Sequence, residues 1–361
     1  MNVRALIDSR EDWLSHLEND LHIHVSRDGD LVSLKYHQIE SPMDMPLVQE
    51  CRGMVVNTAT GRILAHPYNK FWNHGEALAA PIDWSTARVL EKLDGSLMTL
   101  YFNGDDWAVA SSGTPTASGG FGVGSDETFR AAFWRIWKSL GMEYPGLHDV
   151  CFMFELCAKE NRIVVRHDTP RIVLHGARDM RSGHELSLDE LALIAASCNW
   201  EIVKSHPIGT IEDTLAAADQ IDPIQGEGFI VVDGDFNRVK IKSPRYVSLH
   251  HMRGEGMSIS RAIDLWMTGE TAELLTHFPE FRDDVLAVHD RLDAAAASAV
   301  ADCLRHRRLP TRKDFASAVK SAPWSSVTFK LYGRDNLTLD VARDAMRSQS
   351  KAALERLVNH G

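Results

Sequence analysis

Lys92-Leu93-Asp94-Gly95-Ser96 lies between two apolar runs, residues 87–90 and 97–102. Apolar runs of this length favour β-strands, so the lysine is expected where one strand ends and before the next begins. The glycine beside Asp94 permits a tight turn. A lysine in this position can be held against a phosphate group. Taken alone the stretch is ambiguous, because Asp-Gly also forms ordinary hairpin turns.

Covalent nucleotidyl transfer is the chemistry that this stretch suggests. Such a transfer needs an amine nucleophile, cations on the polyphosphate, carboxylates for a divalent metal and a pocket for base and ribose. Lys92 would be the nucleophile, and nearby cations with partial burial would make its neutral amine available. The order Lys-x-Asp-Gly resembles the first motif of the covalent nucleotidyltransferases, which include DNA ligases, RNA ligases and capping enzymes. Asp94 and Gly95 would shape the turn, and Ser96 could donate to a phosphate or ribose oxygen.

A second group of cations follows much later in the chain, in Val239-Lys240-Ile241-Lys242-Ser243. Strand alternation places Lys240 and Lys242 on one face and the apolar residues on the other. Two ammonium groups on one face repel each other, and a shared triphosphate would relieve that repulsion. A solvated edge strand, where lysines also collect, is the alternative.

Two carboxylates stand beside strand-like segments. Glu227 lies between Gly226 and Gly228 at the start of an apolar run, so it could reach a metal or a ribose hydroxyl. Glu155 ends the apolar run of residues 151–154. A carboxylate on a buried strand needs a partner, which could be a ligand or simply an arginine downstream.

The composition narrows the class of protein. The chain has 361 residues, enough for two domains, and its hydrophobic content is 44%. No apolar run approaches the ~20 residues that span a bilayer, and residues 1–10 lack the apolar stretch of a signal peptide. The five cysteines show no Cys-x-x-Cys spacing. We therefore expect a monomeric protein of the reducing cytoplasm with no membrane association.

Net charge is −11, which weighs mildly against a dedicated nucleic-acid binder. The charge is unevenly distributed, however. Residues 250–361 hold 16 basic and 15 acidic residues, whereas the rest of the chain holds 23 basic and 35 acidic ones. Any surface that binds RNA must therefore be a local patch.

The order of segments predicts an α+β fold in two domains. Turn signals between short apolar runs indicate four hairpins, at residues 23–34, 53–65, 97–110 and 229–241. Helical spacing appears at residues 129–140, with Ser125 as a candidate N-cap, and at 186–198 and 210–221. Beyond about residue 246 helical patterns dominate. We expect an antiparallel-sheet domain over residues 1–247 and an all-α domain over 248–361.

The order of short motifs resembles the phage-type RNA ligase 1 family, the tRNA-repair ligases. The resemblance covers most of residues 45–250. It rests on Glu50-Cys51-Arg52-Gly53, Lys70-Phe71-Trp72-Asn73, Glu91 to Leu97, Phe154-Glu155-Leu156, Glu160 to Val164, Glu227-Gly228-Phe229, Lys240-Ile241-Lys242 and Tyr246 to His250. It implies an ATP-grasp-like nucleotidyltransferase domain that joins RNA ends, with ATP and Mg²⁺ or Mn²⁺ as cofactors. Single-stranded or nicked-loop RNA, including tRNA, is the implied partner.

The same resemblance implies roles for single residues. Lys92 would carry the covalent AMP, and Lys240, Lys242 and Glu227 would complete the catalytic set. Nucleotide contacts would come from Arg52, Lys70, Trp72, Glu91, Asp94, Gly95, Glu155 and Gly228, with Glu155 and Glu227 also in the metal shell, directly or through water. The family carries a lysine where this chain has Ser112, so one cation that faces phosphate is missing or supplied elsewhere.

The densest basic cluster lies in the C-terminal half. It consists of Arg305, Arg307, Arg308, Arg312 and Lys313. Clustered arginines suit an RNA backbone, although cations also favour the last turn of a helix for electrostatic reasons. The C-terminal domain is thus a candidate for RNA specificity.

Two other classes of protein share parts of this pattern. A DNA ligase or a capping guanylyltransferase would use the same lysine but would carry short strands after the last lysine motif, where this chain has helical patterns. A ligase-derived module that only binds nucleotide or RNA would fit the acidic charge and Ser112. Retention of the nucleophile favours the enzyme, because binding alone does not require it.

Overall fold

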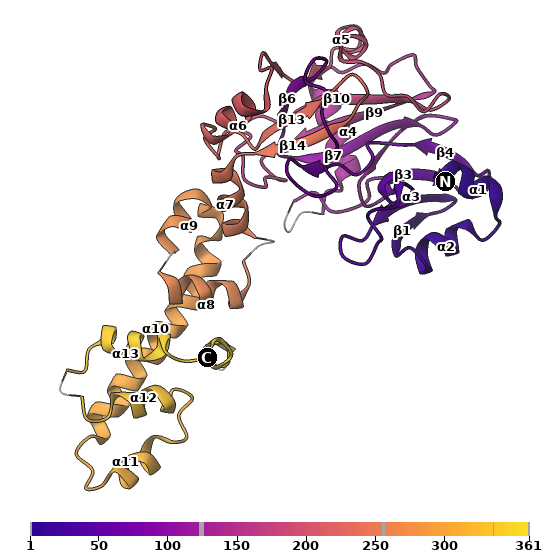
Figure 1. Cartoon of the computed structure of the whole chain (residues 1–361). Coiled ribbons are helices and arrows are strands. Elements are labelled where there is room, and N and C mark those ends of the chain that lie inside the picture. The colour runs from indigo at the N-terminus through magenta and orange to yellow at the C-terminus, as the bar shows by residue number, and fades with distance from the viewer. Residues whose placement is uncertain (1, 123–125, 255–256, 270, 335, 360–361) are drawn as a thin grey trace. The chain divides into compact units, whose positions relative to one another are not determined.

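The computed structural model describes residues 2–122, 126–254, 257–269, 271–334 and 336–359 (Figure 1). The chain divides into two compact units, residues 1–250 and 251–361. The boundary expected from the sequence, between residues 247 and 248, falls inside helix α7 (Pro244–Arg253). Each unit is therefore described by itself.

A small antiparallel sheet forms the N-terminal part of the first unit. Its strands follow one another in chain order: β1 (Ile23–Asp28), β2 (Leu31–Tyr36), β3 (Arg52–Asn57) and β4 (Arg62–Ala65). Apolar residues of α1 (Val3–Ser9), α2 (Trp13–Asn19) and α3 (Pro46–Glu50) pack with the sheet in one buried cluster. This layer places Arg52 at the start of β3.

The second sheet has five strands in the order β11-β10-β9-β7-β8. They are β7 (Ser96–Phe102), β8 (Trp107–Ser111), β9 (Val150–Cys157), β10 (Arg171–Asp179) and β11 (Glu201–Ile202). Helices α4 (Phe129–Ser139) and α5 (Leu188–Ser197) pack against this sheet through a buried aromatic cluster. The aromatic stripe Phe129-Phe133-Trp137 is therefore core.

The third sheet also has five strands, in the order β12-β6-β13-β14-β5. They are β5 (Trp72–Asn73), β6 (Arg88–Lys92), β12 (Ser205–His206), β13 (Gly228–Val232) and β14 (Arg238–Lys242), with α6 (Ile211–Asp219) packed on one face. Strand β6 belongs to this sheet and β7 to the previous one. Asp94-Gly95 is consequently a crossing between two sheets, and the hairpin alternative for this stretch is wrong.

The four predicted hairpins are confirmed as β1–β2, β3–β4, β7–β8 and β13–β14. The sheets are antiparallel except for two short parallel pairings, β10 with β11 and β14 with β5, so they are mixed. Ser125 lies outside the described residues. The side chain of Thr128 caps α4 instead, by accepting from the backbone N–H of Ala131.

The described part of the second unit contains helices and turns and no strand. The helices are α8 (Ile259–Thr268), α9 (Thr271–His277), the short η1 (Pro279–Phe281), α10 (Arg282–His306), α11 (Arg312–Val319), α12 (Ser325–Leu331), α13 (Leu339–Arg347) and α14 (Lys351–Asn359). Long α10 contributes buried residues to one core that it shares with α8, α11, α12, α13 and α14.

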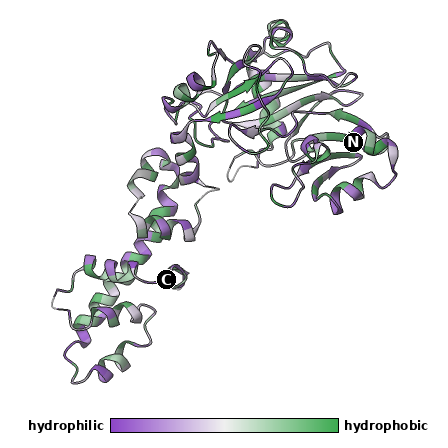
Figure 2. Ribbon diagram, in the orientation of Figure 1, coloured by the Kyte–Doolittle hydropathy of each residue, from purple (hydrophilic) through white to green (hydrophobic). Residues whose placement is uncertain are grey.

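Figure 2 shows the strands of the large sheets mostly green, whereas the helices of the second unit alternate between green and purple. This matches helices with one buried face and one solvated face. None of the helices described is both long and apolar enough to cross a membrane.

The aromatic core under the second sheet should dominate the stability of the first unit. Phe154 on β9 is fully buried and contacts Phe133, Trp137 and Trp200. We expect Phe154→Ala to lower the free energy of unfolding by about 3–5 kcal/mol, because it removes a large buried ring and leaves a cavity. Urea unfolding followed by tryptophan fluorescence measures this.

Leu193 provides the matched control, because its side chain is 75% exposed on α5. Leu193→Ala should change the free energy of unfolding by less than about 0.5 kcal/mol. Equal effects of the two substitutions would contradict the assignment of this core.

Candidate functional site

A carboxylate bound by two lysines lies at the centre of the candidate site. Glu227 Oε2 is 2.6 Å from Lys92 Nζ, and its Oε1 is 2.9 Å from Lys242 Nζ. The side chain of Glu227 is only 4% exposed, whereas Lys92 and Lys242 are 19% and 30% exposed. A carboxylate this deeply buried keeps its charge at low cost only when cations or donors surround it.

The strand register produces this arrangement. Strand β13 lies between β6 and β14, and Gly228 is paired with Lys92 on one side and with Lys242 on the other. Glu227 precedes Gly228, so its carboxylate lies between the two ammonium groups. Gly228 has φ +150°, and a Cβ there would lie 2.2 Å from the carbonyl oxygen of Ile241. Only glycine fits this position.

Asp94 holds the segment between β6 and β7 in place through hydrogen bonds of its carboxylate. Its buried Oδ2 accepts from the backbone N–H groups of Val164 and Val165, at 2.8 and 2.7 Å, and its Oδ1 accepts from the hydroxyl of Tyr246 at 2.8 Å. His167 Nε2 contacts the Asp94 carbonyl oxygen at 2.7 Å. The carboxylate is thus saturated by protein donors, and it does not line the cavity. These contacts give Asp94 a positioning role, and its expected contact with the nucleotide stays a prediction.

Gly95 is required for close approach rather than for a turn. It lacks a positive φ, but a Cβ would lie 2.5 Å from the carbonyl oxygen of Leu156 on β9. A side chain here would push β9 away from the lysine loop.

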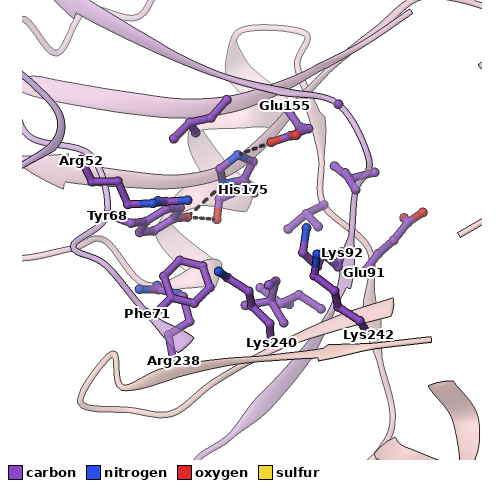
Figure 3. A pocket seen from close by; sticks show the side chains of 16 residues that line it. Arg52, Tyr68, Phe71, Glu91, Lys92, Glu155, His175, Arg238, Lys240 and Lys242 are labelled. Atoms are coloured by element: carbon purple, nitrogen blue, oxygen red, sulfur yellow. Dashed lines mark hydrogen bonds and ion pairs between the residues drawn. The ribbon is translucent and has the colours of Figure 1, made fainter. Parts of the chain in front are cut away.

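A cavity of about 280 Å³ opens beside Lys92 (Figure 3). Its lining includes seven of the residues expected from the sequence, namely Arg52, Glu91, Lys92, Gly95, Glu155, Lys240 and Lys242. Lys240 and Lys242 share the cavity-facing side of β14, as strand alternation predicts, while Val239 and Ile241 are buried on the other side. The solvated edge-strand alternative is therefore wrong.

Lys240 is the most strongly perturbed cation. Burial, followed by the charges of Arg52, Lys70, Lys92 and Lys242, lowers its pKa to about 7. No carboxylate of the described residues forms an ion pair with it, and its Nζ lies 4.9 Å from the centre of the Phe71 ring. An anion placed among these cations would restore the charge of Lys240.

Arg52 reaches the same cavity from the N-terminal sheet. Its guanidinium lies 5.2 Å from the centre of the Phe71 ring, and its buried Nη1 has no hydrogen-bond partner among the residues that the structure describes. A buried donor without a partner is costly, so the geometry favours an anionic ligand at this point.

Glu155 faces a histidine. His175 Nε2 on β10 lies 3.6 Å from Glu155 Oε2, and the hydroxyl of Tyr68 lies 2.7 Å from the His175 carbonyl oxygen and 3.0 Å from His175 Nδ1. Both side chains line the cavity. The carboxylate of Glu155 thus points into the site, with His175 as its neighbour there.

A buried ion triad includes Arg238, which lines the cavity. Glu185 accepts from Arg178 Nη2 at 3.1 Å and from Arg238 Nη2 at 2.7 Å, and the Arg238 guanidinium lies 4.3 Å from the centre of the Tyr68 ring. Arg178 comes from β10 and Arg238 from β14, so the triad ties the two large sheets together.

Lys70 and Trp72 line a second, larger cavity of about 690 Å³, which shares Phe71 and Arg238 with the first. Lys70 Nζ lies 5.2 Å from the centre of the Tyr36 ring and 5.8 Å from that of Trp72. The structure therefore separates these two residues from the Lys92 cavity by one aromatic wall. Gly228 acts through its backbone and Asp94 through its carboxylate, and neither residue lines either cavity.

The five residues of the basic cluster in the second unit are exposed. Arg305 lies in the last turn of α10, Arg307 and Arg308 follow it, and Arg312 and Lys313 begin α11. Arg305 pairs with Asp302 at 3.3 Å. Exposure of the remaining guanidinium groups is compatible with contact to a polyanion.

Metal ligands are sparse in the described residues, where no group of three His, Cys, Asp or Glu side chains could hold an ion. Glu227 is already bound by two lysines. Glu91 and Glu155 are the carboxylates that line the cavity, and among the described residues neither forms an ion pair with a lysine or an arginine. The residues fit a divalent cation only if phosphate oxygens and water supply most of its ligands, which is the usual habit of Mg²⁺.

Tyr68, His175 and Arg238 also line the cavity, although no motif in the sequence predicted them. Tyr68 and His175 belong to segments with no motif spacing. Arg238 stands two residues before Lys240 and therefore on the same face of β14, so strand alternation could have found it.

Comparisons with known proteins identify the family. The model of a family described as RNA ligase matches residues 50–246. A protein of Autographa californica nuclear polyhedrosis virus, whose name combines polynucleotide kinase and RNA ligase, is 23% identical and the match covers 91% of this chain and 49% of that one. The RNA ligase of Rhodothermus phage RM378 is 24% identical, over 62% of this chain and 65% of the phage protein.

Among solved structures, a Naegleria gruberi RNA ligase with ATP and Mn shares 17% identity over 63% of this chain and 76% of its own, with a TM-score of 0.37. The chain spans between about half and two thirds of the length of the two viral and phage relatives. The family match itself covers more than half of the chain and contains the whole lysine cavity. The protein therefore belongs to the RNA ligase family of the phage RNA ligase 1 type.

Proposed function

We propose that this protein is an ATP-dependent RNA ligase that joins a 5′-phosphate end to a 3′-hydroxyl end. The observation that carries the proposal is the contact of Lys92 with Glu227 at the edge of a cavity lined by Arg52, Lys240 and Lys242. An amine beside a carboxylate, with cations grouped around an open space, suits attack on a nucleotide polyphosphate.

In the first step, the Lys92 amine forms a bond to the α-phosphorus of ATP. The bond from that phosphorus to the oxygen bridging to the β-phosphate breaks, and pyrophosphate leaves with the bonding electrons. Glu227, 2.6 Å away, orients the lysine and is the base in contact with its proton. Arg52, Lys240 and Lys242 neutralise the phosphate charge, and Lys70 adds to their field from the second cavity.

In the second step, the 5′-phosphate oxygen of an RNA attacks the phosphorus of the lysyl-AMP, which frees Lys92 and gives an RNA with a 5′-5′ pyrophosphate-linked adenylate. In the third step, the 3′-hydroxyl of the other end attacks the RNA phosphate. AMP leaves, and a phosphodiester remains. Both transfers move a phosphoryl group in line, so the same cations can serve them.

Glu91 and Trp72 complete the proposed nucleotide contacts. Glu91 lines the Lys92 cavity on β6 and would help hold the adenine, while Trp72 lines the neighbouring cavity beside Lys70. Bound Mg²⁺ or Mn²⁺ would supply Lewis-acid stabilisation of the phosphates. Of the chain's own groups, Glu155 suits its coordination shell, directly or through water.

Residues 1–247 are proposed as the adenylyltransferase domain and residues 248–361 as the domain that selects the RNA. The five exposed cations around the end of α10 support the second assignment. A broken tRNA loop fits this scheme as substrate, since it offers both kinds of end on one single-stranded segment.

The second candidate function is a ligase-derived module that binds nucleotide or RNA without catalysis. Ser112 favours it, because the family carries a cation at that position. The Arg238 guanidinium lines the cavity from β14, but it is paired with Glu185 and so does not replace that cation with a free charge. Covalent chemistry separates the two candidates.

Lys92→Ala should abolish the covalent adduct, because no other amine would lie in line with the α-phosphate. The measurement is transfer of label from α-labelled ATP with Mg²⁺ to the protein, together with the intact mass of the product. Lys138→Ala, on the exposed face of α4, is the matched control and should be labelled like the wild type. Labelling of the Lys92 variant to the wild-type level would refute the assignment of the nucleophile.

Binding of ATP above neutral pH should take up a proton at Lys240. Its pKa of about 7 lies below the ordinary lysine value, so it becomes neutral as the pH rises through 7, and a bound triphosphate favours the charged form again. At about pH 8 we expect an uptake approaching one proton. Titration calorimetry in buffers of different ionisation enthalpy measures it.

Lys240→Met should abolish that uptake, and Lys240→Arg should bind ATP without it, because arginine stays charged throughout this range. Equal proton uptake by the wild type and by Lys240→Met would contradict the role of Lys240.

Arg305, Arg307 and Arg308 should contribute to RNA binding by neutralising phosphates. Replacing all three with glutamate should weaken binding of a 5′-phosphorylated single-stranded RNA. It should also reduce the slope of log K against log salt by ~0.7 for each phosphate that the variant no longer neutralises. The control is replacement by lysine, which keeps the charge. An unchanged slope in the glutamate variant would remove the cluster from the RNA-binding surface.

A further inference from the structure

Exposed apolar side chains gather in the segment that joins α4 to β9. Leu140, Tyr144 and Leu147 lie close together in the sequence, and each is between 41% and 53% exposed. A single exposed leucine is common on protein surfaces and needs no explanation. Several large apolar side chains in one short segment form a patch, which is typical of surfaces that bind other molecules.

Aromatic rings extend this patch to the β7–β8 hairpin. The ring centre of Tyr144 lies 5.8 Å from that of Trp134 on α4. The imidazole of His148 stacks on Phe102 with 4.1 Å between ring centres, and it lies 5.8 Å from the ring centre of Trp107. All of these side chains are exposed or half-buried. We call the set the aromatic surface, and it consists of Phe102, Trp107, Trp134, Tyr144, Leu147 and His148.

The turn of the hairpin connects the two parts of the aromatic surface. Burial and the negative charge of Asp106 raise the pKa of Tyr144. This effect requires the Asp106 carboxylate to lie near the Tyr144 hydroxyl. Because Asp106 directly precedes Trp107, the surface is continuous from the hairpin to α4.

The aromatic surface lies at the opposite end of the second sheet from Lys92. Strand β7 begins at Ser96, beside the lysine loop, and ends at Phe102. Six residues of a strand span ~20 Å at ~3.3 Å per residue. The residues of the aromatic surface line neither of the two cavities. The surface is therefore separate from the candidate nucleotide site.

Three carboxylates border the aromatic surface. They are exposed, form no ion pair among the described residues, and belong to Asp105, Asp106 and Glu143. The nearby Asp149 is paired with Arg181, and Lys138 supplies one positive charge in the last turn of α4. The border is therefore acidic.

The acidic border selects among the possible occupants of the surface. It repels the phosphates of RNA, although aromatic rings alone would suit unpaired bases. A second copy that docks through the same surface would bring the same carboxylates together. Arginine and lysine, in contrast, are attracted both by the carboxylates and by the faces of Trp and Tyr rings. A segment that carries basic and apolar side chains complements this surface in both respects.

We propose that the aromatic surface binds a partner protein through a segment of basic and apolar residues, with Tyr144 and Leu147 as its main apolar contacts. Protein interfaces are enriched in aromatic residues, and a few central side chains carry most of the binding free energy. The inference goes beyond RNA ligation and does not depend on it, because the surface lies outside both cavities.

Binding of a synthetic peptide to the full chain tests the proposal. The probe is a fluorescent peptide of lysine and leucine with helical periodicity, and its matched control carries glutamate at every lysine position. We expect the basic peptide to bind at least ~tenfold more tightly than the acidic one. Tyr144→Ser combined with Leu147→Ser should weaken binding of the basic peptide at least ~tenfold. Equal affinities of the wild type and this double variant would overturn the proposal.

Three further variants keep the result interpretable. Leu147→Ser alone leaves the stacking of Tyr144 on Trp137 intact, so it replaces the double variant if that variant fails to fold, and it should weaken binding about threefold. Leu215→Ser is the matched control on α6, because Leu215 is 46% exposed and belongs to the third sheet's side of the unit. It should bind the basic peptide as the wild type does.

The charge argument has its own variant. Asp105→Asn combined with Asp106→Asn should weaken binding of the basic peptide and reduce its dependence on salt, because two attractive charges are removed. Unchanged affinity and salt dependence would overturn the assignment of a basic partner.

The other occupants give distinct outcomes with the same double variant. A dimer that sedimentation velocity detects for the wild type and not for the double variant would replace the partner protein by a second copy. Weaker binding of a 5′-phosphorylated single-stranded RNA by the double variant would assign the surface to RNA. We expect the two proteins to sediment alike and to bind this RNA equally.

Discussion

The candidate site depends on one buried carboxylate held between two ammonium groups. Glu227 contacts Lys92 and Lys242 because Gly228 is paired with both lysines across β13. A shift of this register by one residue would turn both lysines to the opposite face of the sheet. Other residues would adopt the conformation of Gly228 only with strain. The glycine therefore maintains both the strand pairing and the contacts between Glu227 and the two lysines.

The same constraint explains the electrostatics of the cavity. Glu227 offsets one of the two positive charges that it contacts, and among the described residues Arg52 and Lys240 have no carboxylate partner. Burial, followed by the charges of the neighbouring cations, therefore lowers the pKa of Lys240. Repulsion of this kind lowers the stability of the empty site. The same cations would attract a bound polyphosphate. The free energy of binding would then offset the stability that their mutual repulsion costs the folded protein.

The sequence predicted what is local and periodic. The four hairpins and the shared face of Lys240 and Lys242 follow from turn residues and alternation. The order of the motifs also predicted that seven of the residues lining the cavity belong to one site. It did not predict that Asp94-Gly95 crosses between two sheets, because a turn and a crossing need the same residues locally. Only the partners of Asp94, at Val164, Val165 and Tyr246, distinguish them, and these lie far along the chain.

The crossing is what makes the two sheets into one site. The third sheet supplies Lys92, the proposed nucleophile, and the cations by register, whereas the second supplies Glu155 and the bulged His175. These contributions meet only because Gly95 allows β9 to approach the lysine loop and Asp94 ties that loop to α7. A bulge and a close approach are set by tertiary contacts, not by residue type. The residues that sequence analysis missed, Tyr68 and His175, are for that reason the ones whose positions depend on packing between the sheets.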